Sequence, residues 1–291
     1  MQVIFHTGAH ATDEDRLQKT LLRNKEAFAA SGIAVPGPGK YRKLLKDCFE
    51  AMESAPLNDD ARDVLIDAIL DDEQADRLIL SNQFFFGTQR AALEGDQLYP
   101  GAAERVAQMQ SLFAFDQVEI FMAIRNPATF LPAAYRNASP RRLQQIQETT
   151  DPRALRWSEM IERVRAHCPD VPLTVWCNED TPLIWAQIIR EMAGLNPGEK
   201  IIGGFDLLSQ IMSPEGMKRF RAYLKTHRDM SEMHKRRVIA AFLDKFALED
   251  EVEEELDLPG WTEDLVDDMT EIYDEDVFRI QRIPGVQFIE P

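Results

Sequence analysis

Residues 2–18 read QVIFHTGAHATDEDRLQ, and this stretch decides the fold. Gln2–His6 is short, apolar and rich in residues that favour strands, which predicts a buried strand. The turn Thr7–Ala9 follows, and apolar residues then recur at helical spacing over residues 13–30, with Thr12 as the expected N-cap. A strand, a tight turn and a helix N-terminus form a phosphate cradle, because free N–H groups and the helix dipole favour an anion there.

Further short apolar runs alternate with helical patterns along the chain. Strands are expected at 33–36, 77–81, 117–124 and 171–176, and helices at 40–54, 59–73, 101–113, 128–137, 153–167 and 182–194. From about residue 212 the pattern is mainly helical, and residues 283–288 close it as an extended tail.

This alternation predicts one α/β domain over residues 1–291, with a central, mostly parallel sheet flanked by helices. Residues 1–195 form its α/β core, and residues 212–282 form a helical C-terminal extension packed on that core. Ligands bind beyond the carboxyl ends of the strands in such sheets. The loops 6–14, 81–87 and 125–135 are therefore the candidate site.

The composition limits the classes of partner. The formal net charge is −17, which argues against a nucleic-acid or anionic-membrane binder, although a protein partner stays open. No apolar run approaches 18 residues, and no leader peptide is expected. Three cysteines without a CxxC pattern indicate reduced thiols, and we expect a cytoplasmic protein. No calcium-loop pattern occurs, so no metal is expected.

Four segments in order resemble one known family. The Walker pattern GxxxxGK[ST] is absent. The segment from His6 to Gln18, continued by GIAVP at 32–36, resembles the 5′-phosphosulfate loop H-I-G-x-P-K-T-G-[ST]-[ST]-x-L-Q of PAPS-dependent sulfotransferases. LILSNQ at 78–83, IRNP at 124–127 with AAY at 133–135, and VWCNED at 175–180 resemble later motifs of that family. The resemblance covers roughly residues 2–195 and implies a P-loop-like fold.

The resemblance also implies a cofactor and roles for particular residues. PAPS, or its product PAP, would lie against Gly8 and Thr12 through its 5′-phosphate, and against Arg125 and Tyr135 through its 3′-phosphate. Gln83 occupies the position of the general base, and His10 is the titratable base within the loop. The acceptor would be a carbohydrate or another hydroxyl compound.

The sequence differs from the family at the positions that bind phosphate and take part in catalysis. The substituted positions are Ala11 for the loop lysine, Asp13 for a glycine, Glu14 and Asp15 for two hydroxyl residues, Ala133 for a serine and Gln83 for a glutamate. A carboxylate about 5 Å from a phosphate costs roughly 3 kcal/mol at an effective dielectric constant near 20, whereas the helix dipole returns about 0.3–1 kcal/mol. Carboxylates that point inward would therefore repel PAPS, and carboxylates that point outward would only stabilise the helix.

Three hypotheses follow. The first is a sulfotransferase-like protein that is catalytically impaired or inactive, with a remodelled nucleotide pocket. The second is an active PAPS-dependent sulfotransferase that transfers a sulfuryl group through a divergent loop, with Arg125 and His10 taking part. The third is an unrelated α/β transferase with a different substrate, such as a sugar nucleotide. The joint change at six positions favours the first.

The two charged segments 218–237 and 244–276 are interpreted as parts of surface helices and not as binding sites. The basic residues of 218–237 are expected to lie on solvated helix faces that pair with the acidic, amphipathic segment 244–276. The phenylalanines at 84–86 are expected to anchor the core.

Overall fold

The computed structural model describes residues 1–71, 73–252, 256 and 258–291. Within these residues, one sheet carries six parallel strands in the order β2-β3-β1-β6-β7-β8, and β4 and β5 form a separate antiparallel pair. The strands are β1 (Gln2–His6), β2 (Ile33–Ala34), β3 (Arg77–Ser81), β4 (Leu93–Glu94), β5 (Gln97–Leu98), β6 (Gln117–Ile124), β7 (Leu173–Cys177) and β8 (Val286–Phe288).

Helices connect these strands and cover both faces of the sheet. They are α1 (Arg16–Arg23), α2 (Lys25–Ala29), α3 (Arg42–Met52), α4 (Ala61–Leu70), α5 (Ala102–Leu112), α6 (Pro127–Tyr135), α7 (Pro140–Thr149), α8 (Trp157–His167), α9 (Thr181–Ala193), α10 (Asp206–Ile211), α11 (Pro214–Thr226), α12 (Glu232–Phe246), α13 (Glu249–Val252) and α14 (Glu263–Ile280). Short 3₁₀ turns lie at η1 (Pro38–Lys40), η2 (Gln89–Ala92), η3 (Pro152–Ala154) and η4 (Asn178–Asp180).

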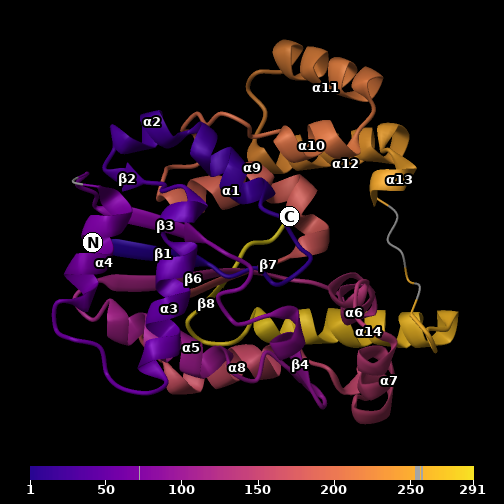
Figure 1. The fold of residues 1–291 in the computed structure, drawn as a ribbon. Coiled ribbons are helices and arrows are strands. Elements are labelled where there is room, and N and C mark those ends of the chain that lie inside the picture. Colours follow the sequence, from indigo (N-terminus) through magenta and orange to yellow (C-terminus); the bar gives the residue numbers. More distant parts are fainter. Residues whose placement is uncertain (72, 253–255, 257) are drawn as a thin grey trace.

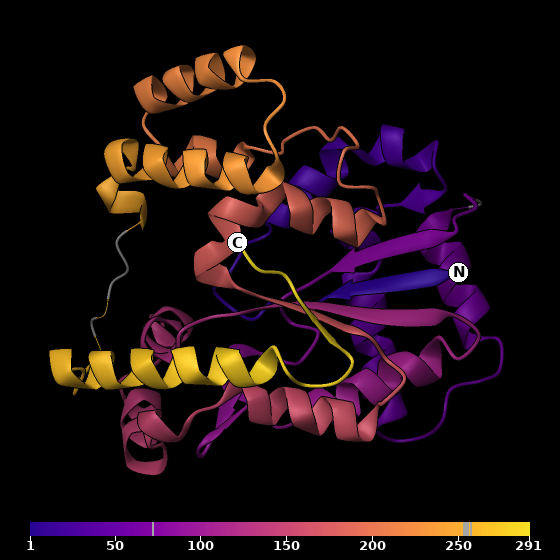
Figure 2. The same cartoon turned by 180° about the vertical axis from the view of Figure 1, so that it is seen from behind.

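The sheet separates two apolar cores, because successive side chains of a strand point to opposite faces. Val3 and Phe5 of β1 pack into one core with α3, α4, α5, α8 and α14, whereas Ile4 packs into the other with α1, α9, α10, α11 and α12. Figures 1 and 2 show α14 and α8 on one side of the sheet and α9 to α12 on the other. The predicted α/β class, with a mostly parallel sheet flanked by helices, is confirmed.

The predicted helix over 13–30 is wrong in its first turn and in its length. Glu14 and Asp15 have left-handed backbones, with φ of 48° and 63°, so α1 begins only at Arg16 and a break at Asn24 precedes α2. Thr12 is not the N-cap, since its Oγ1 donates to the carbonyl of Ala9 at 2.7 Å. The side chains have the spacing of a helix, but the backbone of Glu14 and Asp15 is left-handed and cannot continue one.

The C-terminal part differs from the sequence prediction in a second way. The extended tail at 283–288 contains β8, which pairs in parallel with β7 at the edge of the sheet. Three residues are too few for periodicity to reveal a strand. Helices α7 and α10 and the β4–β5 pair were not predicted either. Residue 72 of the predicted helix 59–73, and residues 253–255 and 257 of the acidic segment, lie outside the described residues.

The basic helices do not pair with the acidic segment in the described part of the chain. Arg219 of α11 pairs with Glu215 of the same helix, and Lys235 of α12 pairs with Glu232. Asp268 of α14 pairs with Arg153. The expected pairing is therefore wrong there, because α14 lies across the sheet from α11 and α12 (Figure 2).

Other side-chain predictions can be checked directly. Phe85 and Phe86 are buried as expected, whereas Phe84 is 47% exposed. The three cysteines are free thiols, and Cys168 and Cys177 are buried. In the described residues no helix combines the length and the apolar character needed to cross a membrane.

Candidate functional site

A cleft of about 1070 Å³ lies beyond the carboxyl ends of β1, β6 and β7. Its walls come from the loop after β1, from α6, from the start of α9, and from α10, α12 and α13. The predicted loops 6–14 and 125–135 both contribute to it, whereas no residue of 81–87 is among its described lining. Residues 243–252, which sequence analysis did not connect with the site, form the opposite wall.

The backbone of the loop after β1 is held by the protein itself. The N–H groups of Thr7 and Ala9 donate to carbonyl oxygens of β6, at 3.0 and 2.9 Å. The N–H of His10 donates to the hydroxyl of Tyr99 at 2.9 Å. A phosphate cradle needs such N–H groups to point at the anion. These three donors are therefore not available to a phosphate in the cleft.

Gly8 permits this path of the chain. Its φ is +96°, a left-handed value, and a Cβ placed there would lie 3.2 Å from the nitrogen of His10 and 3.3 Å from Cα of Gln83. Glycine avoids both the torsional cost and the contact. Gly8 thus brings the loop against the end of β3, where Gln83 is half-buried.

The three acidic residues of the loop have three different surroundings. Asp13 accepts the N–H of Leu17 at 3.2 Å and so completes the first turn of α1. Asp15 forms a two-point ion pair with Arg42 of α3, with nitrogen-to-oxygen distances of 2.5 and 3.2 Å. Glu14 is exposed beside Arg16. Asp13 and Glu14 line the cleft.

Arg42 is a cation beside this loop that the sequence did not reveal. Its Nε and Nη2 donate to the carbonyl of Ser81 at 3.1 and 2.9 Å, at the end of β3. The hydrogen bond from Arg42 lowers the pKa of the Asp15 carboxyl, although burial acts in the opposite direction. Arg42 therefore ties α3, the end of β3 and the loop together. It is the first residue of α3, and nothing in the local sequence distinguishes it from the other basic residues of that helix.

Arg125 supplies a cation inside the cleft. It follows β6, it is 9% exposed, and its Nε donates to Oγ1 of Thr129 at 3.1 Å. Its Nη1 donates to the carbonyl of Ala11, so the guanidinium also contacts the loop. Thr12 is buried beside it and lines the same cleft. The structure thus brings Thr12 and Arg125 together, as the sequence pattern predicted.

Acidic residues nevertheless dominate the cleft. The described lining carries six carboxylates against three guanidinium groups: Asp13, Glu14, Glu179, Asp244, Asp250 and Glu251 against Arg16, Arg125 and Arg136. Glu179 accepts the N–H of Asn126 at 2.8 Å and the hydroxyl of Tyr273 at 3.2 Å. A cleft with this excess of negative charge disfavours a bound polyanion.

His10 and Tyr135 lie outside the cleft. His10 is fully buried, its ring stacks on Tyr99, and its Nδ1 lies 2.6 Å from the Tyr99 hydroxyl. Tyr135 lies on another face of α6, where its hydroxyl donates to the carbonyl of Gln89 at 3.0 Å. Neither residue contacts Arg125 in the described hydrogen bonds, and the residues of this region that line the cleft are Pro132, Ala133 and Arg136.

Burial lowers the pKa of His10 to about 4, with a small opposing effect from the carbonyl of Gly87. The ring is therefore neutral at neutral pH, and its Nδ1 shares a hydrogen bond with the Tyr99 hydroxyl, which also accepts the backbone N–H of His10. A buried, neutral histidine without access to the cleft does not reach a substrate there.

This burial predicts a pH-dependent stability. The unfolded chain binds a proton at His10 near pH 6.5 and the folded chain only near pH 4, so stability falls as the pH drops through this window. The loss amounts to about 3 kcal/mol. His10→Phe keeps the ring contacts and removes the titration, so its unfolding free energy should depend less on pH between 4 and 6.5. Urea unfolding at several pH values measures this, and parallel curves for the two proteins would contradict it.

Comparison with known proteins shows that the fold of this chain is approximately similar to a solved structure. No protein-family model and no curated protein matches this chain. The solved structure of a sulfotransferase from Alicyclobacillus acidocaldarius aligns with 82% of this chain and 97% of its own, at 17% identity and a TM-score of 0.38. A likeness of that size does not place the chain in a family, so its function has to be inferred from the chemistry of the cleft.

Proposed function

We propose that this protein is sulfotransferase-like and that its nucleotide cleft is remodelled, so that PAPS-dependent sulfuryl transfer is impaired or lost. The order of the four motifs supports the relation, since the loop after β1 and the Arg125 segment meet at the cleft that such a protein would use. The remodelling is supported by one observation: the described lining of the cleft beside this loop carries six carboxylates against three guanidinium groups, and no lysine.

The residues present do not fit an adenosine phosphosulfate. Ala11 lines the cleft where the family has a lysine, and its carbonyl accepts from Arg125. That contact occupies one of the guanidinium donors that could otherwise hold a phosphate. Each cleft carboxylate about 5 Å from a phosphate adds roughly 3 kcal/mol of repulsion, which exceeds the contribution of a helix N-terminus. We therefore derive no transfer step through PAPS for this chain.

A second candidate is an active transferase with a divergent loop. Arg125 favours it, because a guanidinium that lines the cleft suits a phosphate. His10 does not add to it, because its ring is buried behind the loop. The two candidates differ in whether the nucleotide binds.

Calorimetric titration with adenosine 3′,5′-bisphosphate separates them. For the wild type we expect no binding with a dissociation constant below about 100 μM, because the net interaction falls short of the roughly 5 kcal/mol that this affinity requires. A low-micromolar dissociation constant would overturn the proposal and support the active transferase.

A rebuilt loop tests the relation to the family. Ala11→Lys with Glu14→Gln restores the loop cation and removes one cleft carboxylate, while Asp13 and Asp15 keep their structural contacts. This variant should gain measurable affinity for the bisphosphate. The matched control, Ala51→Lys with Glu50→Gln on the exposed part of α3, makes the same change of charge far from the loop and should gain none. If the rebuilt loop gains nothing over the control, the assignment of residues 7–15 as a former phosphate loop fails.

A further inference from the structure

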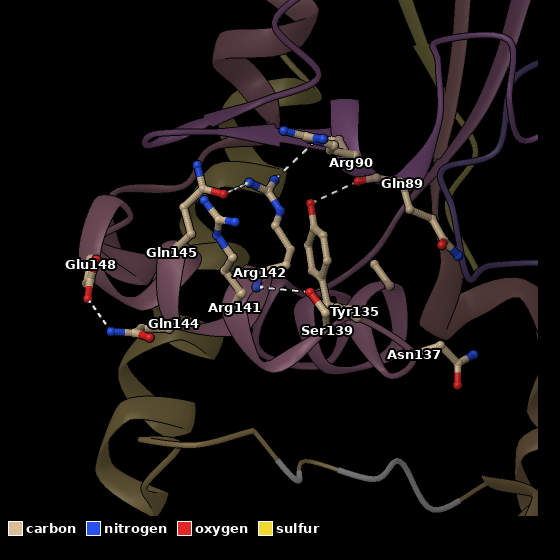
Figure 3. Close-up of a pocket in the computed structure, with 12 residues that line it drawn as sticks. Gln89, Arg90, Tyr135, Asn137, Ser139, Arg141, Arg142, Gln144, Gln145 and Glu148 are labelled. Carbon is tan, nitrogen blue, oxygen red and sulfur yellow. Dashed lines mark hydrogen bonds between the residues drawn. The ribbon is translucent and has the colours of Figure 1, made fainter.

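A second pocket, of about 830 Å³, lies on another face of α6 from the acidic cleft. Pro132, Ala133 and Arg136 line the cleft, whereas Ala134 and Tyr135 line this second pocket. We call it the arginine pocket, and its described lining is Gln89, Arg90, Ala134, Tyr135, Asn137, Ala138, Ser139, Arg141, Arg142, Gln144, Gln145 and Glu148 (Figure 3).

The arginine pocket carries positive charge that the protein does not neutralise. The chain has 50 acidic and 33 basic residues, and many of its arginines are paired, as Arg62 is with Asp116. In the described part of the chain, Arg90, Arg141 and Arg142 have no carboxylate within 4.0 Å. Glu148 accepts a hydrogen bond from Gln144 instead. Three guanidinium groups at one concave site repel one another unless an anion joins them.

Arg142 is held in place by neutral groups. Its Nη1 donates to Oε1 of Gln145 at 3.1 Å, and its Nη2 donates to the carbonyls of Arg90 and Leu93 at 3.2 and 3.1 Å. Its guanidinium carbon lies 5.6 Å from the centre of the Tyr135 ring. Its Nε is buried without a hydrogen-bond partner among the described atoms. The side chain is thus positioned in advance while its charge remains uncompensated.

The rest of the pocket is polar and roomy. Figure 3 shows the side chains of Arg141, Arg142 and Gln145 directed toward the segment that carries Gln89 and Arg90. The small residues Ala134 and Ala138 leave space beside Tyr135. A neighbouring pocket of about 630 Å³ shares Arg90, Arg142 and Gln145, so the polar surface continues beyond the first pocket. Amide and hydroxyl side chains of this kind hydrogen-bond to ligand hydroxyl groups.

We propose that the arginine pocket binds a small, hydroxyl-rich molecule that carries a phosphate or sulfate group. Arginine pairs with tetrahedral oxyanions through two parallel hydrogen bonds, which the exposed Arg90 and Arg141 can form. Arg142, whose N–H groups mostly bind protein carbonyls and Gln145, adds a fixed positive charge. The net charge of −17 repels anions in general, so an anion requires a local basic cluster such as this one. The proposal does not depend on the fate of the nucleotide cleft.

Titration with defined probes tests the ligand class. Glucose 6-phosphate and glucose 6-sulfate are titrated by calorimetry at low ionic strength, beside glucose and inorganic phosphate. We expect one or both sugar esters to bind, inorganic phosphate to bind at least about tenfold more weakly, and glucose not to bind. The stronger of the two esters identifies the oxyanion. If neither ester binds at millimolar concentration, the proposal is wrong. If inorganic phosphate binds as tightly as the esters, the hydroxyl-rich class is wrong.

Charge-removing variants test the location. Arg90→Gln with Arg141→Gln removes two exposed guanidinium groups and keeps the backbone carbonyl that accepts from Arg142, so the fold should be retained. This variant should bind the preferred ester at least about tenfold more weakly. The matched control, Arg221→Gln with Arg228→Gln, removes two exposed charges on the other side of the sheet and should bind like the wild type. Equal affinities of the two variants would place the binding elsewhere and overturn the proposal.

Discussion

Replacing Gly8 with valine is expected to lower the free energy of unfolding by about 4 kcal/mol. The residue has φ of +96°, and any Cβ there would press on the nitrogen of His10 and on Cα of Gln83, at 3.2 and 3.3 Å. Both neighbours are backbone atoms, so neither can turn aside as a side chain would. A β-branched residue adds further contacts and disfavours this φ most strongly.

Urea unfolding of Gly8→Val measures this loss, with Gly39→Val as the control. Gly39 has no atom within 4 Å of an added Cβ and no left-handed backbone, so its substitution should cost far less. Equal losses for the two variants would mean that the loop after β1 relaxes around a side chain, which would contradict the tight path described for it.

Replacing Asp276 with alanine should lower the unfolding free energy by a similar amount, about 4 kcal/mol. Asp276 of α14 is 4% exposed, and it accepts the N–H of Ser158 at 3.0 Å as well as the hydroxyl of Ser158. Without the carboxylate, a buried donor in the first turn of α8 loses its partner. The substitution also leaves a void between α14 and α8.

Glu275→Ala is the control for this prediction, because Glu275 precedes Asp276 on the same helix and is exposed. Chemical denaturation of both variants should show a small loss for Glu275→Ala and a large one for Asp276→Ala. If the two losses agree within about 0.5 kcal/mol, the buried contact between α14 and α8 does not contribute as described.

The sheet could be predicted from the sequence because buried parallel strands are continuous apolar runs. β1, β3, β6 and β7 each coincide with such a run and are each bounded by polar or turn residues. The start of α1 could not be predicted, because apolar spacing does not reveal the left-handed backbone of Glu14 and Asp15, and Asp15 pairs with Arg42 of a different helix. The local sequence around residues 13–15 gives no indication of this contact between Asp15 and Arg42.

For the same reason, only part of the candidate site could be predicted from the sequence. Arg125 stands directly after β6 and Thr12 lies in the loop that follows β1, so topology alone placed them at one edge of the sheet. The acidic wall of Asp244, Asp250 and Glu251 belongs to helices whose docking no local pattern specifies. The orientation of Tyr135 depended on which face of α6 it occupies, and one step along the helix separates it from the cleft-lining Arg136.

The position of β8 has a consequence for how the protein is made. β8 pairs with β7, yet it follows that strand by more than a hundred residues. During synthesis the outer edge of β7 therefore emerges from the ribosome unpaired and stays so until α9 to α14 have been translated. An unpaired strand edge invites association with other chains. The nascent protein thus passes through an interval in which this strand edge is exposed, and the interval ends only when Val286–Phe288 have been translated.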